Sequence, residues 1–378
     1  MHHPESSSLN SHVFVFFFVS SLREHTVYIL AINSHLLCQS HLKDLKWRAF
    51  MTTTLATLTT TVLVRSHKPT AAMVARMREW HRSLADAGVR MHISMDVTHG
   101  RDAADCVLVG VPGATLHTYD EPQMLRAYPY LGELIHTMPG ERKWSGLESL
   151  GDNTPEEIGE ALAGGWRKWA GERHSLAWGF HAEAISLWWR SVYPDCADGD
   201  RPRAIWVLED DVGYTAELAA LVAAYANDVE ADLITDEPTQ SEPLSAVRCQ
   251  LNPDLVATEP VVWQGWCWHD TCTVAFNELV PSERRWKTKE HAQRFSARLV
   301  DELARQCDAG CSAWSEQFAV SLCNSSANFK CVALHPSTLP PDPKRQYNHD
   351  AKVDEELFKE LCANPQTCHG VLLHAMKW

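Results

Sequence analysis

The sequence predicts an α/β fold with a mixed, mainly parallel sheet that is flanked by helices. Two strand-helix-strand units lead to this prediction, one at residues 57–97 and one that ends in the strand AIWVL at 204–208. Parallel strands need a long crossover connection, which a helix normally supplies. Three consecutive carboxylates, at 209–211, directly follow the second unit. We expect one domain over residues 56–378, with a separate Trp-rich lobe in the second half as the alternative.

The first unit begins with TTTVLVRSH, which is rich in β-branched residues and predicts a strand. The next segment has apolar residues at helical spacing, and Gly88 is a natural helix stop. RMHISMDV then alternates as a second strand. The apolar helix positions are Met73, Met77, Trp80 and Leu84.

The second unit is expected to begin with CVLVGVP as a strand, followed by loops over residues 134–174. SLAWGFHAEAISLWWRSV has an apolar stripe typical of a helix packed on a sheet, and it leads into AIWVL. TAELAALVAAYAN then predicts a helix and ADLIT a further strand. Helices on both faces of one sheet follow from this order.

Residues 1–55 are expected to be a leader or a degenerate membrane anchor, and disorder of this segment is compatible with either. VFVFFFVS and VYILAI are apolar, but Arg23, Glu24 and His25 interrupt them before the roughly 20 residues that a spanning helix needs. The segment before them has no Lys or Arg, unlike a signal peptide. Met51 offers an alternative start. Membrane association through this segment is therefore one expectation, and a mis-started leader is the other.

The overall charge argues against nucleic-acid binding. The formal net charge is -14, whereas phosphate backbones are bound by clustered Lys and Arg. The sequence also has no Gly-rich phosphate loop, which weakens kinase and dehydrogenase interpretations. Cys267, His269 and Cys272 offer zinc ligand types, but a second well-spaced pair is missing, so disulfides or buried thiols are favoured.

The stretch LEDDV places Glu209, Asp210 and Asp211 at the end of a buried strand. Successive strand residues point to opposite sides, so Glu209 and Asp211 should project together and Asp210 away from them. Two carboxylates at the carboxyl end of a sheet strand can hold a hard divalent cation. Capping of the following helix is an equally good explanation from the charges alone.

LEDDV after a hydrophobic strand resembles the DxD-type motif of GT-A-fold glycosyltransferases, in particular the procollagen galactosyltransferase and lipopolysaccharide glycosyltransferase group. The resemblance covers roughly residues 57–340 and implies a GT-A-like (Rossmann-like) catalytic domain. It implies a metal-dependent glycosyltransferase that moves a sugar from a nucleotide-sugar donor to a hydroxyl of a glycan or protein acceptor. In that family the acidic pair binds Mn²⁺ or Mg²⁺. Glu209 takes the first position, where the family has Asp, and Asp211 takes the last.

The resemblance also implies a catalytic base and a third metal ligand. Glu316, in the first turn of a helix expected from about Ser315, matches the position of the base, although Gln317 replaces a second acid there. Glu at a helix start is equally an ordinary dipole effect. His335, after the strand in FKCVALHP, matches the metal-binding His of many members, with His349 as its rival.

The resemblance implies donor contacts just after the first strands, although Arg65 could equally be a plain surface cation. An acceptor platform is expected in a Trp-rich segment. Core packing is the alternative for these Trp residues. The donor-binding residues assigned in this way are Arg65, Ser66, Asp96 and Asp210; the platform residues are Trp263, Trp266 and Trp268.

Two other function classes stay open. A metal-dependent nucleotidyltransferase or phosphohydrolase would need a further acid beside the first pair, for which Asp96 and Asp232 are the candidates. A non-catalytic nucleotide-sugar-binding protein of this fold is the other, because Glu209 and Gln317 depart from the family pattern. The resemblance favours the Golgi or ER lumen, with the cytoplasm as the alternative.

Overall fold

A computed structural model describes residues 60–98, 100–132, 176–194, 201–236, 273–281, 284–286, 288–313, 315–340, 353–364, 370–374 and 376. All of them belong to one compact unit, Thr54–Trp378. The expected leader at 1–55, the CWHDTC segment, the Trp platform and His349 lie outside the described residues.

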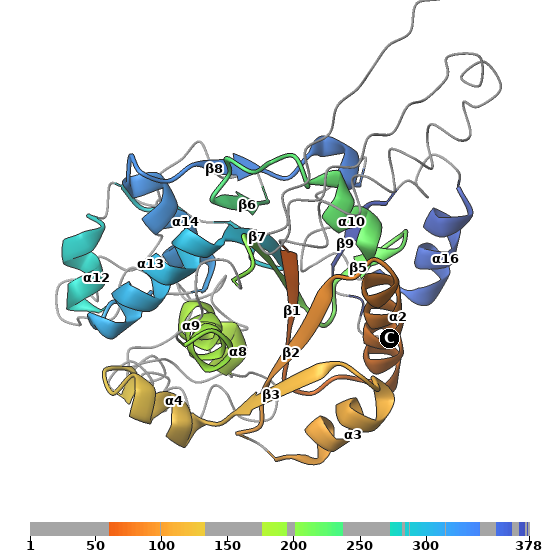
Figure 1. Cartoon of the computed structure of the whole chain (residues 1–378), viewed down its shortest axis with the longest axis horizontal. Helices are drawn as coiled ribbons and strands as arrows, with labels where there is room; N and C mark the ends of the chain where they lie inside the picture. Colours follow the sequence, from red (N-terminus) through yellow and green to blue (C-terminus); the bar gives the residue numbers. More distant parts are fainter. Residues whose placement is uncertain are drawn as a thin grey trace, which may run out of the picture. The chain divides into compact units, whose positions relative to one another are not determined.

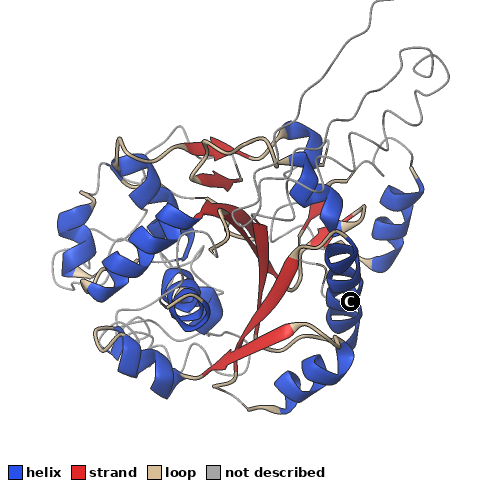
Figure 2. Cartoon of the chain, in the orientation of Figure 1, coloured by secondary structure: helices blue, strands red, loops and turns tan. Residues whose placement is uncertain are grey.

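A seven-stranded mixed sheet forms the centre of the fold, in the order β3-β2-β1-β4-β7-β6-β8 (Figures 1 and 2). The neighbours β3-β2, β2-β1, β1-β4 and β6-β8 are parallel, and β7 runs antiparallel to both β4 and β6. The fold is therefore α/β with a mainly parallel sheet, as the sequence predicts. The strands are β1 Thr60–Ser66, β2 Arg90–Asp96, β3 Thr115–Tyr119, β4 Ala204–Glu209, β6 Leu233–Thr235, β7 Ala292–Ser296 and β8 Cys331–Ala333; β5 Gly213–Tyr214 and β9 Leu372–Leu373 form a separate pair.

Two apolar layers cover the two faces of the sheet, because alternate strand residues point in opposite directions. Leu63 of β1 and Val207 of β4 pack into the layer that contains α9, α13 and α14. Val64 and Leu208 pack into the layer that contains α2, α3 and α10, on the other side of the sheet in Figure 1. The helices are α2 Ala71–Asp86, α3 Asp102–Gly110, α4 Glu121–Ala127, α8 Leu176–Gly179, α9 His181–Val192, α10 Leu218–Ala224, α12 Val274–Leu279, α13 Ala297–Asp308, α14 Ser315–Ser325 and α16 Glu355–Ala363, with a 3-10 turn, η6, at Pro336–Thr338.

Most elements lie where the sequence predicts them, but CVLVGVP is not a strand. Its first five residues complete α3, which begins at Asp102. Asp102 and Asp105 in the first turn favour a helix start, and the buried positions Ala104 and Val107 are three residues apart, as on a helix face. The strand of this unit, β3, follows it. A short apolar run does not by itself distinguish a strand from a helix.

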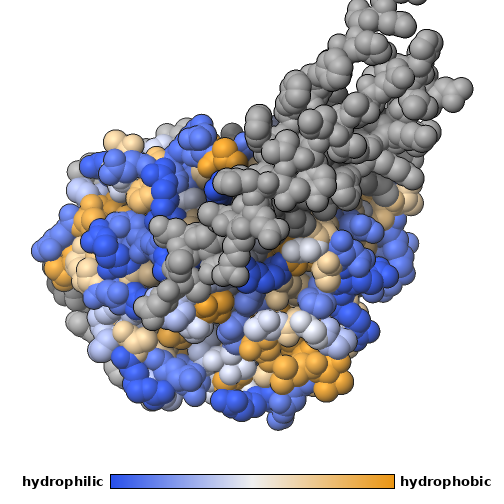
Figure 3. Space-filling view, viewed as in Figure 1, coloured by the Kyte–Doolittle hydropathy of each residue, from blue (hydrophilic) through white to orange (hydrophobic). Residues whose placement is uncertain are grey.

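On the face drawn in Figure 3, the described surface is largely hydrophilic, with an apolar area at the lower right, where Figure 1 places α3. Leu108 and Val109 of that helix are exposed. Within the described ranges, no helix has both the length and the apolar character needed to cross a membrane. The apolar stretches of the leader lie outside those ranges.

Glu183 of α9 is a fully buried carboxyl group that gives the fold a pH dependence. Burial raises the pKa of Glu183 from 4.5 to about 7, although the Tyr130 hydroxyl donates a hydrogen bond to Oε1 of Glu183 at 3.5 Å. Between these pH values the unfolded chain releases the proton and the folded chain keeps it, so stability falls as the pH rises. The free energy of unfolding of the wild type should therefore fall by roughly 3 kcal/mol more between pH 4 and pH 8 than that of Glu183→Gln. Urea unfolding of both proteins at both pH values measures this difference. If the substitution changed the free energy of unfolding equally at both pH values, the prediction would be contradicted.

Candidate metal centre

The candidate metal centre lies at the carboxyl ends of β1 and β4. These strands are parallel, and their register places Arg65 opposite Glu209. The backbone N–H of Asp210 donates to the carbonyl oxygen of Arg65 at 3.1 Å, and that of Glu209 donates to the carbonyl oxygen of His291 at 3.0 Å. The acidic stretch is therefore tied to strand neighbours on both sides, which fixes the directions of its side chains.

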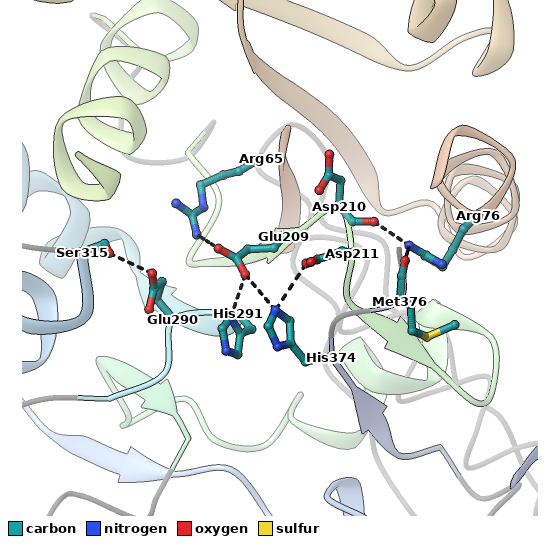
Figure 4. Close-up of polar contacts among 10 residues, drawn as sticks. All are labelled: Arg65, Arg76, Glu209, Asp210, Asp211, Glu290, His291, Ser315, His374 and Met376. Carbon is teal, nitrogen blue, oxygen red and sulfur yellow. Dashed lines mark hydrogen bonds and ion pairs between the residues drawn. The ribbon is translucent and has the colours of Figure 1, made fainter. Parts of the chain in front are cut away.

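The acidic side chains alternate in direction, as the sequence predicts. In Figure 4, Glu209 and Asp211 point towards His374, and the carboxylate of Asp210 points away from it. Oδ2 of Asp210 instead accepts a hydrogen bond from the Ser66 hydroxyl at 2.6 Å. Oε1 of Glu209 forms an ion pair with Arg65 at 3.0 Å, which leaves Oε2 directed at the histidines.

Two buried histidines, remote from the acidic stretch in the chain, complete the cluster. Nδ1 of His291, just before β7, lies 2.7 Å from Oε2 of Glu209. Nε2 of His374, just after β9, lies 3.4 Å from Oε2 of Glu209 and 3.4 Å from Oδ1 of Asp211. The two imidazole rings are stacked at an angle of 10°. Glu209, His291 and His374 thus offer ligand atoms that all lie within 4.8 Å of one another.

The carboxylates of the cluster differ in their electrostatics. Burial opposes the charged form of Glu209, but His291, His374 and Arg65 together hold the pKa of this carboxyl group well below its usual value. Burial and the charge of Asp211 raise the pKa of Asp210 to about 6. Glu209 therefore keeps its negative charge to a lower pH than Asp210 does.

The histidines differ as well. Burial and the neighbouring His374 lower the pKa of His291 to about 4. Burial also opposes the charge on His374, but Asp211 and Glu209 outweigh it and raise the pKa of His374 to about 9. Without a metal ion, a neutral imidazole and an imidazolium therefore face the acidic pair at neutral pH, and the imidazolium balances part of the negative charge.

The donor set fits a divalent first-row ion. At ligand distances of about 2.0–2.2 Å, neighbouring ligand atoms are roughly 3–3.5 Å apart. The 3.4 Å separations of His374 Nε2 from the Glu209 and Asp211 oxygens have this size. Imidazole nitrogens beside carboxylates suit Mn²⁺ better than Mg²⁺, which prefers oxygen ligands and retains water.

The residues assigned to donor binding make contacts within the protein. The guanidinium of Arg65 is buried and paired with Glu209, and the Ser66 hydroxyl is bonded to Asp210. Oδ1 of Asp96 accepts from the backbone N–H and the hydroxyl of Thr98, and Oδ2 accepts from the N–H of Leu176 at the start of α8. Asp96 thus anchors α8, and nucleotide contacts of these residues stay predictions.

The structure does not bring His335 to the acidic pair. Nε2 of His335 lies 3.2 Å from Asp228, and its ring stacks on Tyr225. His335 follows a strand, as the sequence predicts. That strand is β8, which pairs with β6 and lies three positions from β4 in the sheet. His374 occupies the place expected for His335. The same strand-then-His pattern occurs in VLLHA and is the signal that could have identified it.

The start of α14 approaches the cluster through Glu290, the residue before His291. The Ser315 hydroxyl donates to Oε1 of Glu290 at 2.8 Å, beside Glu209 in Figure 4. Glu290 is buried, and burial together with the charge of Glu209 raises its pKa to about 7. Glu316, the next residue of α14, is also buried. Glu290 and His291 carry no motif that sequence reasoning could recognise.

Asp232, the other acid considered for a second metal ion, takes part in a different network. Its carboxylate accepts hydrogen bonds from the Ser296 hydroxyl, the Arg298 guanidinium and the N–H of Lys330. In the described part of the chain, neither Asp232 nor Asp96 belongs to the group of converging ligand atoms formed by Glu209, His291 and His374.

We expect His374→Ala to weaken Mn²⁺ binding by more than about 10-fold and His335→Ala to leave it unchanged. Both substitutions remove one histidine, but only His374 contacts Glu209 and Asp211. A titration that follows free Mn²⁺ by electron paramagnetic resonance compares the two variants directly. A loss of affinity in His335→Ala alone would restore the assignment made from the sequence.

No protein-family description and no characterised protein sequence matches the chain. Several solved glycosyltransferase structures resemble it. The galactosyltransferase LgtC, in complex with donor and acceptor sugar analogues, is 10% identical, with a TM-score of 0.31 and 74% of both chains covered. Mouse xyloside xylosyltransferase 1 is 7% identical, with a TM-score of 0.31 and 73% of this chain and 86% of the other covered. The mannosyltransferase Ktr4p from S. cerevisiae is 10% identical, with a TM-score of 0.30 and 76% and 78% covered. These likenesses are distant, and the identities of 7–10% leave the residues of the site to indicate the function.

Proposed function

We propose that the chain is a divalent-metal-dependent glycosyltransferase that moves a sugar from a nucleotide-sugar to a hydroxyl group of a glycan or protein. The observation that carries the proposal is the convergence of Glu209, Asp211 and His374 at the carboxyl end of β4. In α/β proteins this edge of the sheet is where ligands bind. The resemblance of LEDDV to a DxD-type motif is the reason for proposing a nucleotide-sugar as the donor.

Glu209, Asp211 and His374 would hold the ion, with His291 orienting Glu209 through its 2.7 Å contact. Mn²⁺ fits this mixed donor set better than Mg²⁺. When bound, the ion would supply positive charge that stabilises the leaving nucleoside diphosphate. Arg65 fixes the carboxylate of Glu209 from the opposite side and is itself shielded from water.

Glu316 is the proposed base that removes the proton of the acceptor hydroxyl. It is the second residue of α14, and the first residue, Ser315, contacts Glu290. General-base catalysis typically contributes about 10²–10⁴-fold.

We expect Glu316→Gln to lower the transfer rate by about 10²-fold or more while Mn²⁺ and donor binding stay unchanged. The amide keeps the shape of the side chain but does not accept the proton. Steady-state transfer assays, with Glu290→Gln as the matched variant, measure this. Full activity of Glu316→Gln together with a collapse in Glu290→Gln would transfer the role to Glu290.

A thermal-shift screen tests the proposed function. The full chain is heated with a panel of nucleoside diphosphates and nucleotide-sugars, each with and without Mn²⁺. A ligand that binds the native state at 100 times its Kd adds about 2.7 kcal/mol to stability. We expect a shift that requires both Mn²⁺ and one nucleotide. No shift with any pair would contradict nucleotide-sugar binding, and a shift without turnover would support the non-catalytic alternative.

A further inference from the structure

His374 lies on a short segment, Gly370 to His374 with Met376, that we call the His374 segment. Its strand β9 pairs with β5 over only two residues, Gly213↔Leu373 and Tyr214↔Leu372. So short a strand pair is only marginally stable by itself. Further contacts must therefore keep the His374 imidazole at its 3.4 Å distances from Glu209 and Asp211.

One of these contacts is a bridge made by Arg76 of α2. Its Nη2 donates to the carbonyl oxygen of Asp210 at 2.8 Å and to that of Met376 at 2.9 Å. Asp210 stands within the acidic stretch and Met376 two residues after His374, so one nitrogen joins the two halves of the metal centre (Figure 4). The N–H of Met376 also donates to the carbonyl oxygen of Asp211 at 2.9 Å.

The second contact is close packing between Gly213 and the Met376 side chain. A Cβ atom at position 213 would lie 1.8 Å from Sδ of Met376. Gly370, at φ +89°, similarly allows no Cβ, which would lie 2.1 Å from the Tyr214 hydroxyl. The His374 segment is therefore packed closely against β5 at two glycines, and a larger residue would force the Met376 side chain at position 213, or the Tyr214 side chain at position 370, to move.

We propose that Arg76 is a positioning residue that holds the His374 segment against the acidic stretch, so that the metal centre forms only when this segment is docked. The proposal rests on the proposed function, because it assumes that His374 binds the ion. Arg76 points to the backbone carbonyls of Asp210 and Met376 and acts through the position of His374. Partners that orient a ligand without touching the metal typically change metal affinity by about 10–100-fold.

The test is an Mn²⁺ titration of the full chain, followed by electron paramagnetic resonance, in the absence of nucleotide. We expect Arg76→Met to weaken Mn²⁺ binding by about 10–100-fold and Arg76→Lys, which keeps a donor, to recover part of it. The control is Arg82→Met, which removes the same charge from an exposed position of the same helix and should bind as the wild type does. The thermal midpoint without metal separates a local effect from a loss of fold.

A second pair of variants approaches the segment from the other side. Gly213→Ala should weaken Mn²⁺ binding by displacing Met376, and Gly213→Ala combined with Met376→Ala should recover part of the loss. This pair tests the docking requirement even if Arg76→Met does not fold. Wild-type affinity in folded Arg76→Met would overturn the positioning role of Arg76, and wild-type affinity in Gly213→Ala would overturn the requirement that the His374 segment be docked. No Mn²⁺ binding by the wild type would instead overturn the proposed function, and the positioning role with it.

Discussion

Asp211→Ala is expected to abolish metal-dependent nucleotide-sugar binding and to reduce sugar transfer to background, while the protein stays folded. Nε2 of His374 lies 3.4 Å from the carboxylate of Asp211 and 3.4 Å from that of Glu209. Its charge also raises the pKa of Asp210, so its removal relieves repulsion within the acidic stretch. Calorimetric titration with Mn²⁺ should show a loss of affinity of more than about 100-fold.

The control for this substitution is Asp228→Ala, which removes an acidic residue paired with His335 outside the metal centre. It should leave Mn²⁺ affinity and transfer unchanged. Unchanged Mn²⁺ affinity in Asp211→Ala would remove this residue from the metal centre. Helix capping does not explain the acidic stretch, because β5 follows it and α10 begins only at Leu218.

Glu209→Ala is expected to damage the fold as well as the site. Arg65 is only 4% exposed and has Glu209 as its ion-pair partner. Removal of one member of a buried ion pair leaves an uncompensated charge and typically lowers stability by about 3–5 kcal/mol. Urea unfolding of the metal-free proteins measures this difference.

Glu209→Gln is the matched variant, because the amide oxygen still accepts hydrogen bonds from Arg65. It should lose Mn²⁺ affinity like Glu209→Ala but retain more of the stability. If Glu209→Ala proved as stable as the wild type, the Arg65 pair would contribute nothing to folding, and the case for Glu209 as an anchored ligand would weaken.

The core of the fold could be predicted from the sequence because its signals are local. Val62, Leu63 and Val64 alternate between the two apolar layers, as a strand period requires. The same two-residue period of a strand predicted that Glu209 and Asp211 project to the same side of the chain, and both point towards His374. The prediction of a strand at CVLVGVP was wrong because a short apolar run is compatible with both a strand and a helix. The acidic residues that favour a helix start, Asp102 and Asp105, lie before this run.

The histidines of the site could not be predicted in the same way, because their places depend on long-range strand pairing. His291 reaches Glu209 because β7 runs antiparallel to β4, and no local pattern shows that direction. His374 reaches it through β9, a strand of two residues. His335 and His374 both follow a short apolar run, but the strand before His335 lies at the far edge of the sheet, after β6.

The most direct test of the metal centre is an anomalous difference map from crystals of the full chain soaked in Mn²⁺. Data collected near the manganese absorption edge give an anomalous signal that distinguishes the ion from the lighter protein atoms. We expect one strong peak within about 2.0–2.4 Å of the Glu209 and Asp211 carboxylates and of Nε2 of His374. A map with no peak at these three residues, or with the peak beside His335 and Asp228, would contradict the account.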